Sequence, residues 1–411
     1  MQTHSQKILI VDDNPSNIQL LGTILSTNQY QAEFATSGAD ALEWLNNESF
    51  DLVLLDIMMP GMDGYEVCRK IKADKETAHI PVIFITAKQD TDSIVKGFDV
   101  GAVDYISKPF EERELLARLA FHLELLTARR KLEVLNSELQ EKNDTMMQSL
   151  RYAEKLQEAM LPADKELKTN FNAHFVLFKP LHHLSGDFYW AKNIGNKTLL
   201  VLGDSMGHGI PGALLSVLGM SSLSEITNNS NDLSPANILT KLRDRENNLF
   251  SSNAGIMHDS IDMAVCLFDP ENNTLTFSGA NLPVAIVSSD SKPGKPLNAN
   301  TQTLTNNDKN LTYIPGNKNT IGRNLFESDF ENITIQLSKG DKIYLFSDGF
   351  RDQFGGAKGS KFKKKRFLNL LLETSTLNAE KQKNKLNSTF EKWKRNQPQI
   401  DDVTIIGIQP N

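Results

Sequence analysis

The sequence has little cysteine and no long apolar run. Its two cysteines, Cys68 and Cys266, both stand among apolar residues, so we expect buried thiols and neither a disulfide framework nor a zinc site. The apolar run at residues 8–11 is too short for a signal peptide, and no run has the length of a membrane span. These absences predict a protein of a reducing, cytoplasmic compartment that has no membrane partner.

The sequence also lacks a strong excess of charge of either sign. The formal net charge is −7, and neither end of the chain forms an acidic or basic tail. No helix-turn-helix pattern or basic recognition helix is present, so we expect no nucleic-acid partner. The length of 411 residues is enough for two or three domains, each with its own core.

In the first region, residues 1–122, short apolar runs alternate with amphipathic ones. The pattern predicts strands at residues 7–11, 31–35, 52–56, 81–86 and 104–107, with helices between them, and therefore a doubly wound α/β fold with a parallel sheet. Sites in such sheets lie at the carboxyl ends of the strands. The side chains expected there can hold a cation and a phosphoryl group together: Asp12, Asp13, Asp56, Thr86 and Lys108.

This region resembles the CheY-type receiver domain of two-component response regulators over residues 5–122. The resemblance implies that Asp56, in the stretch 54–61, accepts a phosphoryl group from a histidine kinase. It implies a Mg²⁺ site made by Asp12, Asp13, Asp56 and the carbonyl of Met58. It also implies that Thr86 and Lys108 hold the phosphoryl oxygens, that Tyr105 is the switch aromatic, and that the Lys108–Pro109 peptide is cis.

Residues 111–160 contain few glycines or prolines and predict one long helix, which Pro162 ends. Apolar residues recur at intervals of three and four, which favours a coiled-coil linker over residues 123–165 and a homodimer. These positions are Leu132, Leu135, Leu139, Met146, Leu150, Ala153 and Met160. The spacing slips near residues 139–143, which places Asn143 and Gln157 in the seam. The alternative is a helix that packs on its own domains.

In the third region, four acidic residues stand where apolar strands begin or end. The stretch 202–213 carries Asp204 between a predicted strand and a predicted helix, and Asp187, Asp348 and Asp401 have similar settings. One such aspartate alone more often caps a turn. Four of them suit a hard divalent cation such as Mg²⁺ or Mn²⁺.

The motifs Gly186-Asp187, Gly203-Asp204 with Gly207-His208-Gly209, Ser347-Asp348-Gly349 and Asp401-Asp402-Val403-Thr404 resemble the metal-dependent serine/threonine phosphatases of the PPM type. The SpoIIE-like branch is the most similar, over residues 170 to 411, and residues 151–162 are similar to a helix found in that branch. The resemblance implies an α+β sandwich that binds two Mn²⁺ or Mg²⁺ ions.

The resemblance also assigns roles to residues of this sequence. Asp204 is implied to bridge both metals, with the carbonyl of Ser205 on one of them and with Asp187, Asp348 and Asp401 completing the two shells. Asp402 is the less expected member of its pair, because the family ligand stands at the first position. His208 is either a proton donor to the leaving serine oxygen or a structural histidine. Asp262 and Asp352 are candidates for a third metal.

Many eukaryotic relatives carry a phosphate-binding arginine before the first metal acid, and residues 179–185 contain none. Either Lys179 substitutes for it, or the substrate protein positions its own phosphate. A basic cluster lies between residues 358 and 366, and it is either a solvated face or a surface that steers an acidic phosphoprotein. Residues 288–312 are polar and predict a mobile surface loop.

The sequence therefore predicts a receiver (1–122), a coiled-coil linker (123–165) and a SpoIIE-like PPM phosphatase (166–411). The expected activity is dephosphorylation of phosphoserine or phosphothreonine proteins under the control of Asp56. The resemblance implies a phosphorylated anti-sigma-factor antagonist as the substrate. The rival interpretation is a catalytically silent adaptor that docks a partner through the phosphatase fold, and retention of the four metal acids favours the enzyme.

Overall fold

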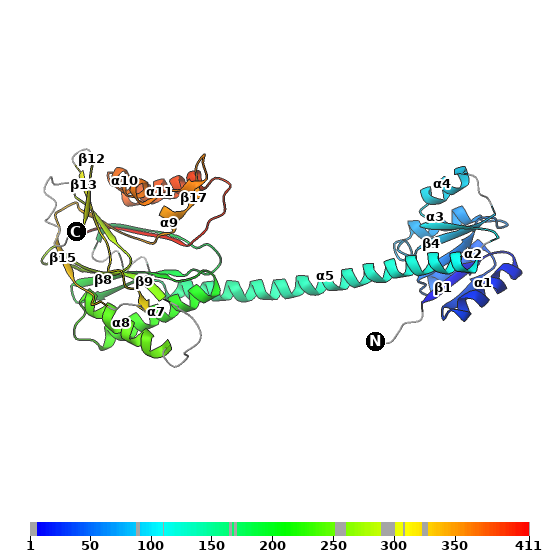
Figure 1. Cartoon of the computed structure of the whole chain (residues 1–411), viewed down its shortest axis with the longest axis horizontal. Helices are drawn as coiled ribbons and strands as arrows, with labels where there is room; N and C mark the ends of the chain where they lie inside the picture. The colour runs from blue at the N-terminus through cyan, green and yellow to red at the C-terminus, as the bar shows by residue number, and fades with distance from the viewer. Residues whose placement is uncertain are drawn as a thin grey trace. The chain divides into compact units, whose positions relative to one another are not determined.

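The computed structural model describes residues 6–87, 91–109, 111–163, 167, 171–250, 260–288, 301–306, 309–322 and 328–410, without the side chains of residues 249 and 250. The chain forms two compact units, Met1–Asp144 and Thr145–Asn411, and Figure 1 labels many of their elements.

The first unit contains a five-stranded parallel sheet in the order β2-β1-β3-β4-β5. The strands are β1 (Lys7–Val11), β2 (Gln31–Ala35), β3 (Leu52–Asp56), β4 (Val82–Thr86) and β5 (Asp104–Ser107). The helices between them are α1 (Pro15–Thr27), α2 (Gly38–Asn47), α3 (Gly64–Ala73) and α4 (Thr91–Asp99). The predicted doubly wound fold is confirmed, and β4 begins one residue later than the sequence suggested.

Local sequence explains where these helices begin. The side chains of Asn14, Ser37 and Asp63 each accept a hydrogen bond from a backbone N–H in the first turn of α1, α2 and α3. The sheet strands are apolar because each sheet face is covered. One core lies under α2 and α3, and a second lies under α1 and the long helix that follows β5.

Helix α5 (Glu112–Met160) has 49 residues, and the boundary between the two units falls within it. Its first turns carry Leu115, Leu119 and Leu123 into the core of the first unit. Beyond them the apolar side chains of Leu132, Leu139 and Met146 are exposed. The long helix is therefore confirmed, and its middle presents apolar residues to solvent.

The second unit is a sandwich of two six-stranded sheets, as predicted. One sheet has the main order β15-β10-β9-β8-β7, with β14 paired to β9, and the other has the order β12-β13-β11-β16-β19-β6. The first sheet comprises β7 (Asp187–Ile194), β8 (Lys197–Ser205), β9 (Ser260–Asp269), β10 (Thr274–Ala280), β14 (Ile321–Gly322) and β15 (Ile333–Gln336). The second comprises β6 (Phe171–Lys179), β11 (Val284–Ser288), β12 (Gln302–Asn306), β13 (Lys309–Ile314), β16 (Lys342–Phe346) and β19 (Val403–Pro410).

Helices cover the outer face of each sheet (Figure 1). Helices α7 (Ile210–Asn229) and α8 (Pro235–Phe250) pack on the first sheet. The second carries α9 (Gly349–Asp352), the hairpin β17 (Phe354–Gly355) and β18 (Ser360–Lys361), α10 (Lys364–Thr374) and α11 (Ala379–Lys394). Helix α7 is long and apolar enough to cross a membrane, but more than half of that stretch is buried, as in a core helix of a globular domain.

The predicted loop over residues 288–312 is wrong in its second half, and its first half, residues 289–300, lies outside the described residues. Strands β12 and β13 form a hairpin that extends the second sheet from β11. Leu304, Leu311 and Tyr313 pack on the core with polar residues between them, and this period of two is the signal that the polar composition obscured. Cys68 and Cys266 are buried free thiols, as predicted.

Candidate functional sites

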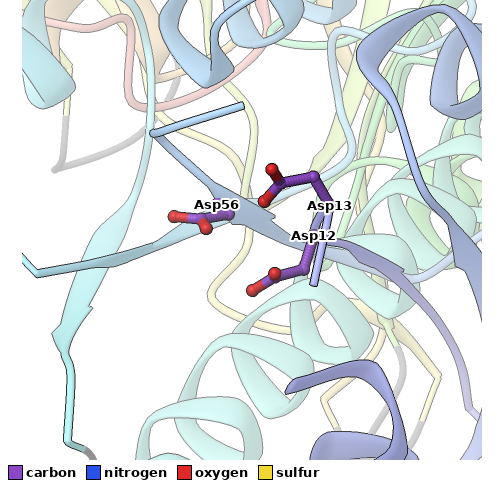
Figure 2. A group of neighbouring side chains, drawn as sticks. All are labelled: Asp12, Asp13 and Asp56. Atoms are coloured by element: carbon purple, nitrogen blue, oxygen red, sulfur yellow. The ribbon is translucent and has the colours of Figure 1, made fainter. Parts of the chain in front are cut away.

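Three carboxylates meet at the carboxyl edge of the parallel sheet (Figure 2). Asp12 and Asp13 follow β1, and Asp56 ends β3. One oxygen of each carboxylate lies within 4.8 Å of the others. Asp12 is buried and Asp13 is exposed, so the group opens to solvent on one side. Three hard oxygen ligands around one open position fit a Mg²⁺ ion.

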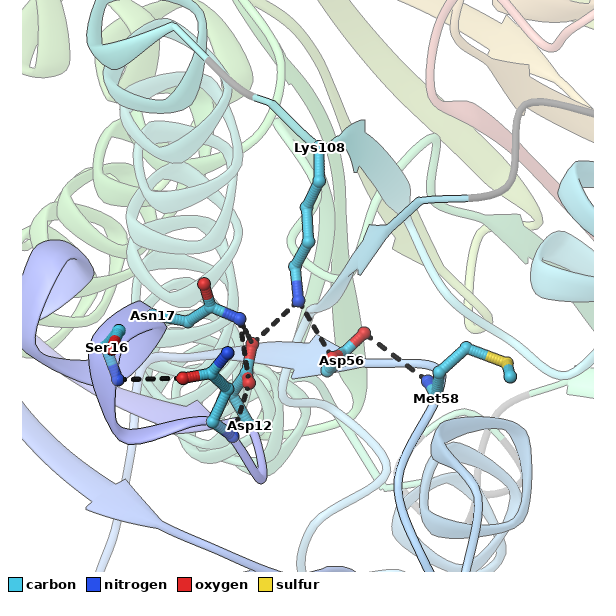
Figure 3. Close-up of polar contacts among 7 residues, drawn as sticks. Asp12, Ser16, Asn17, Asp56, Met58 and Lys108 are labelled. Carbon is cyan, nitrogen blue, oxygen red and sulfur yellow. Dashed lines mark hydrogen bonds and ion pairs between the residues drawn. The ribbon is translucent and has the colours of Figure 1, made fainter.

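Lys108 completes this arrangement from the end of β5. Its Nζ donates hydrogen bonds of 2.8 Å to Asp12 Oδ2 and of 2.8 Å to Asp56 Oδ2, as Figure 3 shows. Asn17 Nδ2 donates to both oxygens of Asp12, and the Met58 N–H donates to Asp56 Oδ1 at 3.3 Å. Oδ2 of Asp56 is thus held toward the ammonium group of Lys108.

Burial and ion pairing shift the pKa values of this site in opposite directions. Burial raises the pKa of Asp56, and the hydrogen bond and charge of Lys108 partly offset that rise. Burial also acts against the charged form of Lys108, but its bonds to Asp12 and Asp56 leave its pKa above the ordinary value. A lysine kept charged beside a partly buried carboxylate can neutralise added phosphoryl charge.

The two predicted switch residues line one cavity of the receiver. Thr86, at the end of β4, is buried, and Tyr105, on β5, is half-buried and forms an edge-to-face pair with Phe98 at a centroid distance of 6.2 Å. The Lys108–Pro109 peptide is cis, as the resemblance implied. A phosphoryl group that drew Thr86 toward Asp56 would leave Tyr105 room to move.

In the second unit, three aspartates lie side by side across one sheet. Asp187 on β7 is in register with Asp204 on β8, and Asp204 is in register with Asp262 on β9. Asp348 is the N-cap residue of α9, two residues after the end of β16, and Asp401 stands just before β19. The structure thus brings the four predicted metal acids to one edge of the sandwich and adds Asp262 to them. We call these five aspartates the acid group.

Burial, with repulsion between neighbouring acids, raises the pKa values of this group. Burial and the charges of Asp187, Asp348, Asp401 and Asp262 raise the pKa of Asp204 well above its ordinary value. Burial raises the pKa of Asp187 to about 8, and burial together with the charge of Asp348 raises the pKa of Asp401 to about 6. Five acids with raised pKa values and oxygen ligands are typical of a site for cations of high charge.

These acids are more widely spaced than those of the receiver. Among the described residues, only Asp12, Asp13 and Asp56 bring three ligand atoms within 4.8 Å of one another. A wider set suits two cations that share Asp204 and fill their shells with water. The donor set therefore fits the two Mn²⁺ or Mg²⁺ ions that the family resemblance implies.

A close approach of backbone places carbonyl oxygens beside these acids. The Ser205 N–H donates to the Gly186 carbonyl at 3.2 Å. A Cβ on Gly186 would come within 3.0 Å of the Ser205 carbonyl oxygen and within 2.7 Å of the Gly207 carbonyl oxygen. Glycine is therefore required before Asp187, and the predicted Ser205 ligand lies next to the acid group.

Asp402 has a structural role, whereas its neighbour Asp401 is expected to be the metal ligand. Its carboxylate is buried and accepts hydrogen bonds from the Leu181 and Gly186 N–H groups, both at 2.6 Å. Ser347 acts similarly, because its hydroxyl donates to Asp187 Oδ2 at 2.6 Å and accepts from the Thr404 N–H at 3.0 Å. These two residues fix the loop and side chain of Asp187.

The interpretation of Gln157 as a coiled-coil seam residue is wrong. Its side chain is buried in the second unit, where Oε1 accepts from the Ser185 N–H at 3.0 Å and Nε2 donates to the Ser185 carbonyl at 2.6 Å. Nε2 also donates to Ser216 Oγ on α7 at 2.8 Å. The end of α5 is thus attached to the loop that precedes Asp187.

The cationic residues before Asp187 have other partners. Lys179 pairs with Glu391 of α11 at 2.8 Å, so the suggestion that it substitutes for an arginine is not supported by its position. His183 Nδ1 lies 3.2 Å from Glu154 Oε2. His208 is exposed and packs against His182 with tilted rings at a centroid distance of 5.2 Å, and its charge partly offsets the rise in the pKa of Asp401 that burial causes. His208 is therefore placed at the acid group and is no core histidine.

The two candidates for a third metal differ. Asp262 belongs to the acid group and accepts a hydrogen bond from Asn281 Nδ2, and burial raises its pKa to about 6. Asp352 instead pairs with Lys361 at 3.3 Å. The sequence did not predict three contacts at this site: that of Gln157 with Ser185, that of Ser347 with Asp187 and that of Arg351 with Asp348. A Ser before a metal acid is a weak signal for the second of these, and no sequence pattern marks the other two.

Comparison with known proteins agrees with both halves. The family model of the response regulator receiver domain matches residues 8–120, and that of stage II sporulation protein E (SpoIIE) matches residues 194–411, more than half of the chain. Asp187 lies shortly before the second range. The SiaA-PP2C domain of Pseudomonas aeruginosa is similar in structure, with a TM-score of 0.56 and 26% identity, over 66% of this chain and 99% of that one.

Two relatives resemble the receiver alone. The response regulator PleD of Caulobacter vibrioides is 43% identical over 115 residues, which are 28% of this chain and 25% of PleD. A probable cyclic di-GMP phosphodiesterase of Vibrio cholerae is 48% identical over 117 residues, 28% of this chain and 26% of that protein. The chain therefore spans about a quarter of the length of these relatives.

Proposed function

Because the chain belongs to the SpoIIE family and carries a response regulator receiver domain, we propose that it is a phosphorylation-controlled, metal-dependent protein serine/threonine phosphatase. The observation that carries the proposal is the row of Asp187, Asp204 and Asp262 across one sheet, with Asp348 and Asp401 at the same edge. We assign residues 1–122 to the receiver, 123–165 to the linker and 166–411 to the phosphatase.

Asp187, Asp204, Asp348 and Asp401, with the Ser205 carbonyl, would hold two Mn²⁺ or Mg²⁺ ions. Such a pair of cations activates a bound water and stabilises charge on phosphoryl oxygens. Ser347 and Asp402 keep Asp187 in place, and Gly186 allows the Ser205 carbonyl to reach the same point. His208 stands beside Asp401, from where it can donate a proton to the leaving serine oxygen.

The input is phosphoryl transfer from a histidine kinase to Asp56. Asp12, Asp13, Asp56 and the Met58 carbonyl would hold one Mg²⁺ ion, while Lys108 and Thr86 contact the incoming phosphoryl oxygens and Tyr105 follows. The support is the 2.8 Å contact of Lys108 with Asp56 and the 4.8 Å grouping of the three carboxylates.

For the substrate we propose a phosphorylated anti-sigma-factor antagonist of a partner-switching pathway, acting in the cytoplasm. This proposal comes from the family resemblance. The rival function, an adaptor with a silent phosphatase fold, predicts lost metal acids, and this chain retains all four.

The first test separates the enzyme from the adaptor. The purified full chain, given a serine-phosphorylated protein with Mn²⁺ or Mg²⁺, is expected to release inorganic phosphate, because the acid group can bind both cations. An excess of chelator should stop the release, and added Mn²⁺ should restore it. Phosphate release that persists in chelator would contradict the metal mechanism, and no release with either cation would favour the adaptor.

We further propose that two chains pair through α5 as a homodimer. Leu132, Leu139 and Met146 are spaced by seven residues, and their side chains are 57–67% exposed in the single chain. In the last turn of the same helix, Gln157 holds the backbone of Ser185, two residues before Asp187. A rotation of the paired helices would therefore act on the loop that carries a metal ligand.

Insertions in the linker test this coupling. Four residues inserted after Leu139 turn the downstream helix by roughly 400°, close to a full turn, and should preserve control by Asp56. Two inserted residues turn it by roughly 200° and should uncouple phosphatase activity from Asp56 phosphorylation. The measurement is phosphate release with and without acetyl phosphate. If both insertion variants respond to acetyl phosphate as the wild type does, the linker is only a tether.

A further inference from the structure

The charges of Arg351 and Lys361 act on Asp348 of the acid group, and Lys364 lies near Arg351; we call these three side chains the cationic flank. Arg351 Nη2 lies 3.8 Å from Asp348 Oδ2. Lys361 stands on β18, and its charge acts on Asp348 as well. Lys364 begins α10, with its Nζ 3.5 Å from the ring centroid of Tyr313. Positive charge is therefore placed at one border of the acid group.

The position of Arg351 is set by a rigid environment. The preceding Phe350 is buried, with ring centroids 5.1 Å from Phe362 and 4.9 Å from Phe367. The Lys363 N–H donates to the Arg351 carbonyl at 2.7 Å, which ties α9 to the start of α10. Asp348 and Arg351 stand three residues apart in this anchored turn, so the backbone that carries the guanidinium keeps a fixed relation to a predicted metal ligand.

Arg351 also faces groups other than Asp348. Burial raises the pKa of Asp262, and the charge of Arg351 acts against that rise. Burial likewise raises the pKa of Tyr313, and Arg351 partly offsets it through the phenol oxygen. The guanidinium thus lies near two members of the acid group and beside a buried tyrosine that Lys364 covers on its ring face.

Other nearby cations are directed elsewhere. Lys179 is paired with Glu391, and His183 with Glu154. Within the basic cluster of residues 358–366, Arg366 stacks on Trp393, with its Cζ 4.3 Å from the ring centroid. Of the arginines whose side chains the structure describes, Arg351 is the one that ion-pairs with a predicted metal acid.

We propose that Arg351 binds the phosphoryl oxygens of the substrate phosphoserine, and that Lys364 and Lys361 extend this positive surface toward acidic residues around it. The inference rests on the proposed phosphatase function and adds its substrate-binding group. A guanidinium matches two phosphate oxygens with two parallel N–H donors, which an ammonium cannot do. Once a cation neutralises Asp348, Arg351 is left to pair with the substrate.

Binding of inorganic phosphate to the full chain in Mn²⁺, measured by calorimetry, tests this directly. A hydrogen bond to a charged group contributes enough that R351A should weaken phosphate binding by about tenfold or more. R351K should recover part of the affinity, because it restores the charge without the paired donors. The matched control is K365A, which removes an exposed charge from the same helix start and should bind phosphate as the wild type does.

A second measurement distinguishes binding of phosphate from orientation of Asp348. Hydrolysis of p-nitrophenyl phosphate by R351A should require no more Mn²⁺ than the wild type for half-maximal rate, because the lost guanidinium paired with Asp348, while phosphate inhibits it more weakly. A raised Mn²⁺ requirement with unchanged phosphate affinity would overturn the proposal, as would a wild-type chain that binds no phosphate. A wild type that binds phosphate through Arg351 but cleaves no phosphoserine protein would refute only the proposed function.

Discussion

Replacement of Asp204 by Asn should lower phosphate release from a phosphoserine protein by roughly a thousandfold, because two cations together supply several kcal/mol of transition-state stabilisation. Asp204 is in register with both Asp187 and Asp262, and its pKa responds to all four neighbouring acids. An amide at this position keeps the shape of the side chain but removes the charge that both cations would share.

The D204N chain should remain folded. In the absence of metal the substitution removes one of five mutually repelling carboxylates, so the thermal midpoint of unfolding should not fall. The control D244N changes an exposed aspartate of α8 by the same group and should keep wild-type activity. The measurements are phosphate release in saturating Mn²⁺ and thermal unfolding in chelator. Wild-type turnover by D204N would exclude the two-metal mechanism.

Replacement of Asp56 by Ala should abolish the covalent phosphoryl adduct that acetyl phosphate forms on the chain in Mg²⁺. Asp56 Oδ2 is held 2.8 Å from Lys108 Nζ, and one of its carboxylate oxygens lies within 4.8 Å of ligand atoms of Asp12 and Asp13. This carboxylate therefore has both a cation site and a lysine placed to neutralise the incoming charge.

Mass spectrometry of the intact chain measures the adduct. The wild type and the control D99A, which alters an exposed aspartate at the end of α4, should each gain one phosphoryl group. D56A should gain none, and phosphatase activity should no longer respond to acetyl phosphate. An adduct of the same yield on D56A would place the phosphoacceptor elsewhere.

Most of the receiver could be predicted from the sequence. Its strands alternate with amphipathic helices, and Asp12, Asp13, Asp56, Thr86 and Lys108 all follow or end apolar strands. In a parallel sheet this position is sufficient to bring side chains together, because the carboxyl ends of all strands lie at one edge. The hydrogen bonds of Lys108 to Asp12 and Asp56 are the geometry that this rule anticipates.

The sandwich was less predictable, because its antiparallel strands place sequence-distant groups by register. The polar composition predicts a loop where the structure has the hairpin β12–β13, because a polar edge strand differs little in composition from a loop. The sequence offers Asp262 and Asp352 equally as candidates for a third metal, and only the pairing of Asp262 opposite Asp204 separates the two. Gln157 fitted the helical repeat of α5 equally well as a seam residue and as a buried contact.

By itself, then, the sequence determined the order of the elements and the chemical kind of each site, because strand periodicity and carboxylates at strand ends are local properties. The tertiary structure decided which polar residues act together. It buried Gln157 against Ser185, turned Asp402 to the backbone of Gly186, paired Lys179 with Glu391 and placed Arg351 beside Asp348. Each of these contacts joins elements far apart in the chain or depends on how one turn is anchored. Local sequence does not encode how such segments pack together.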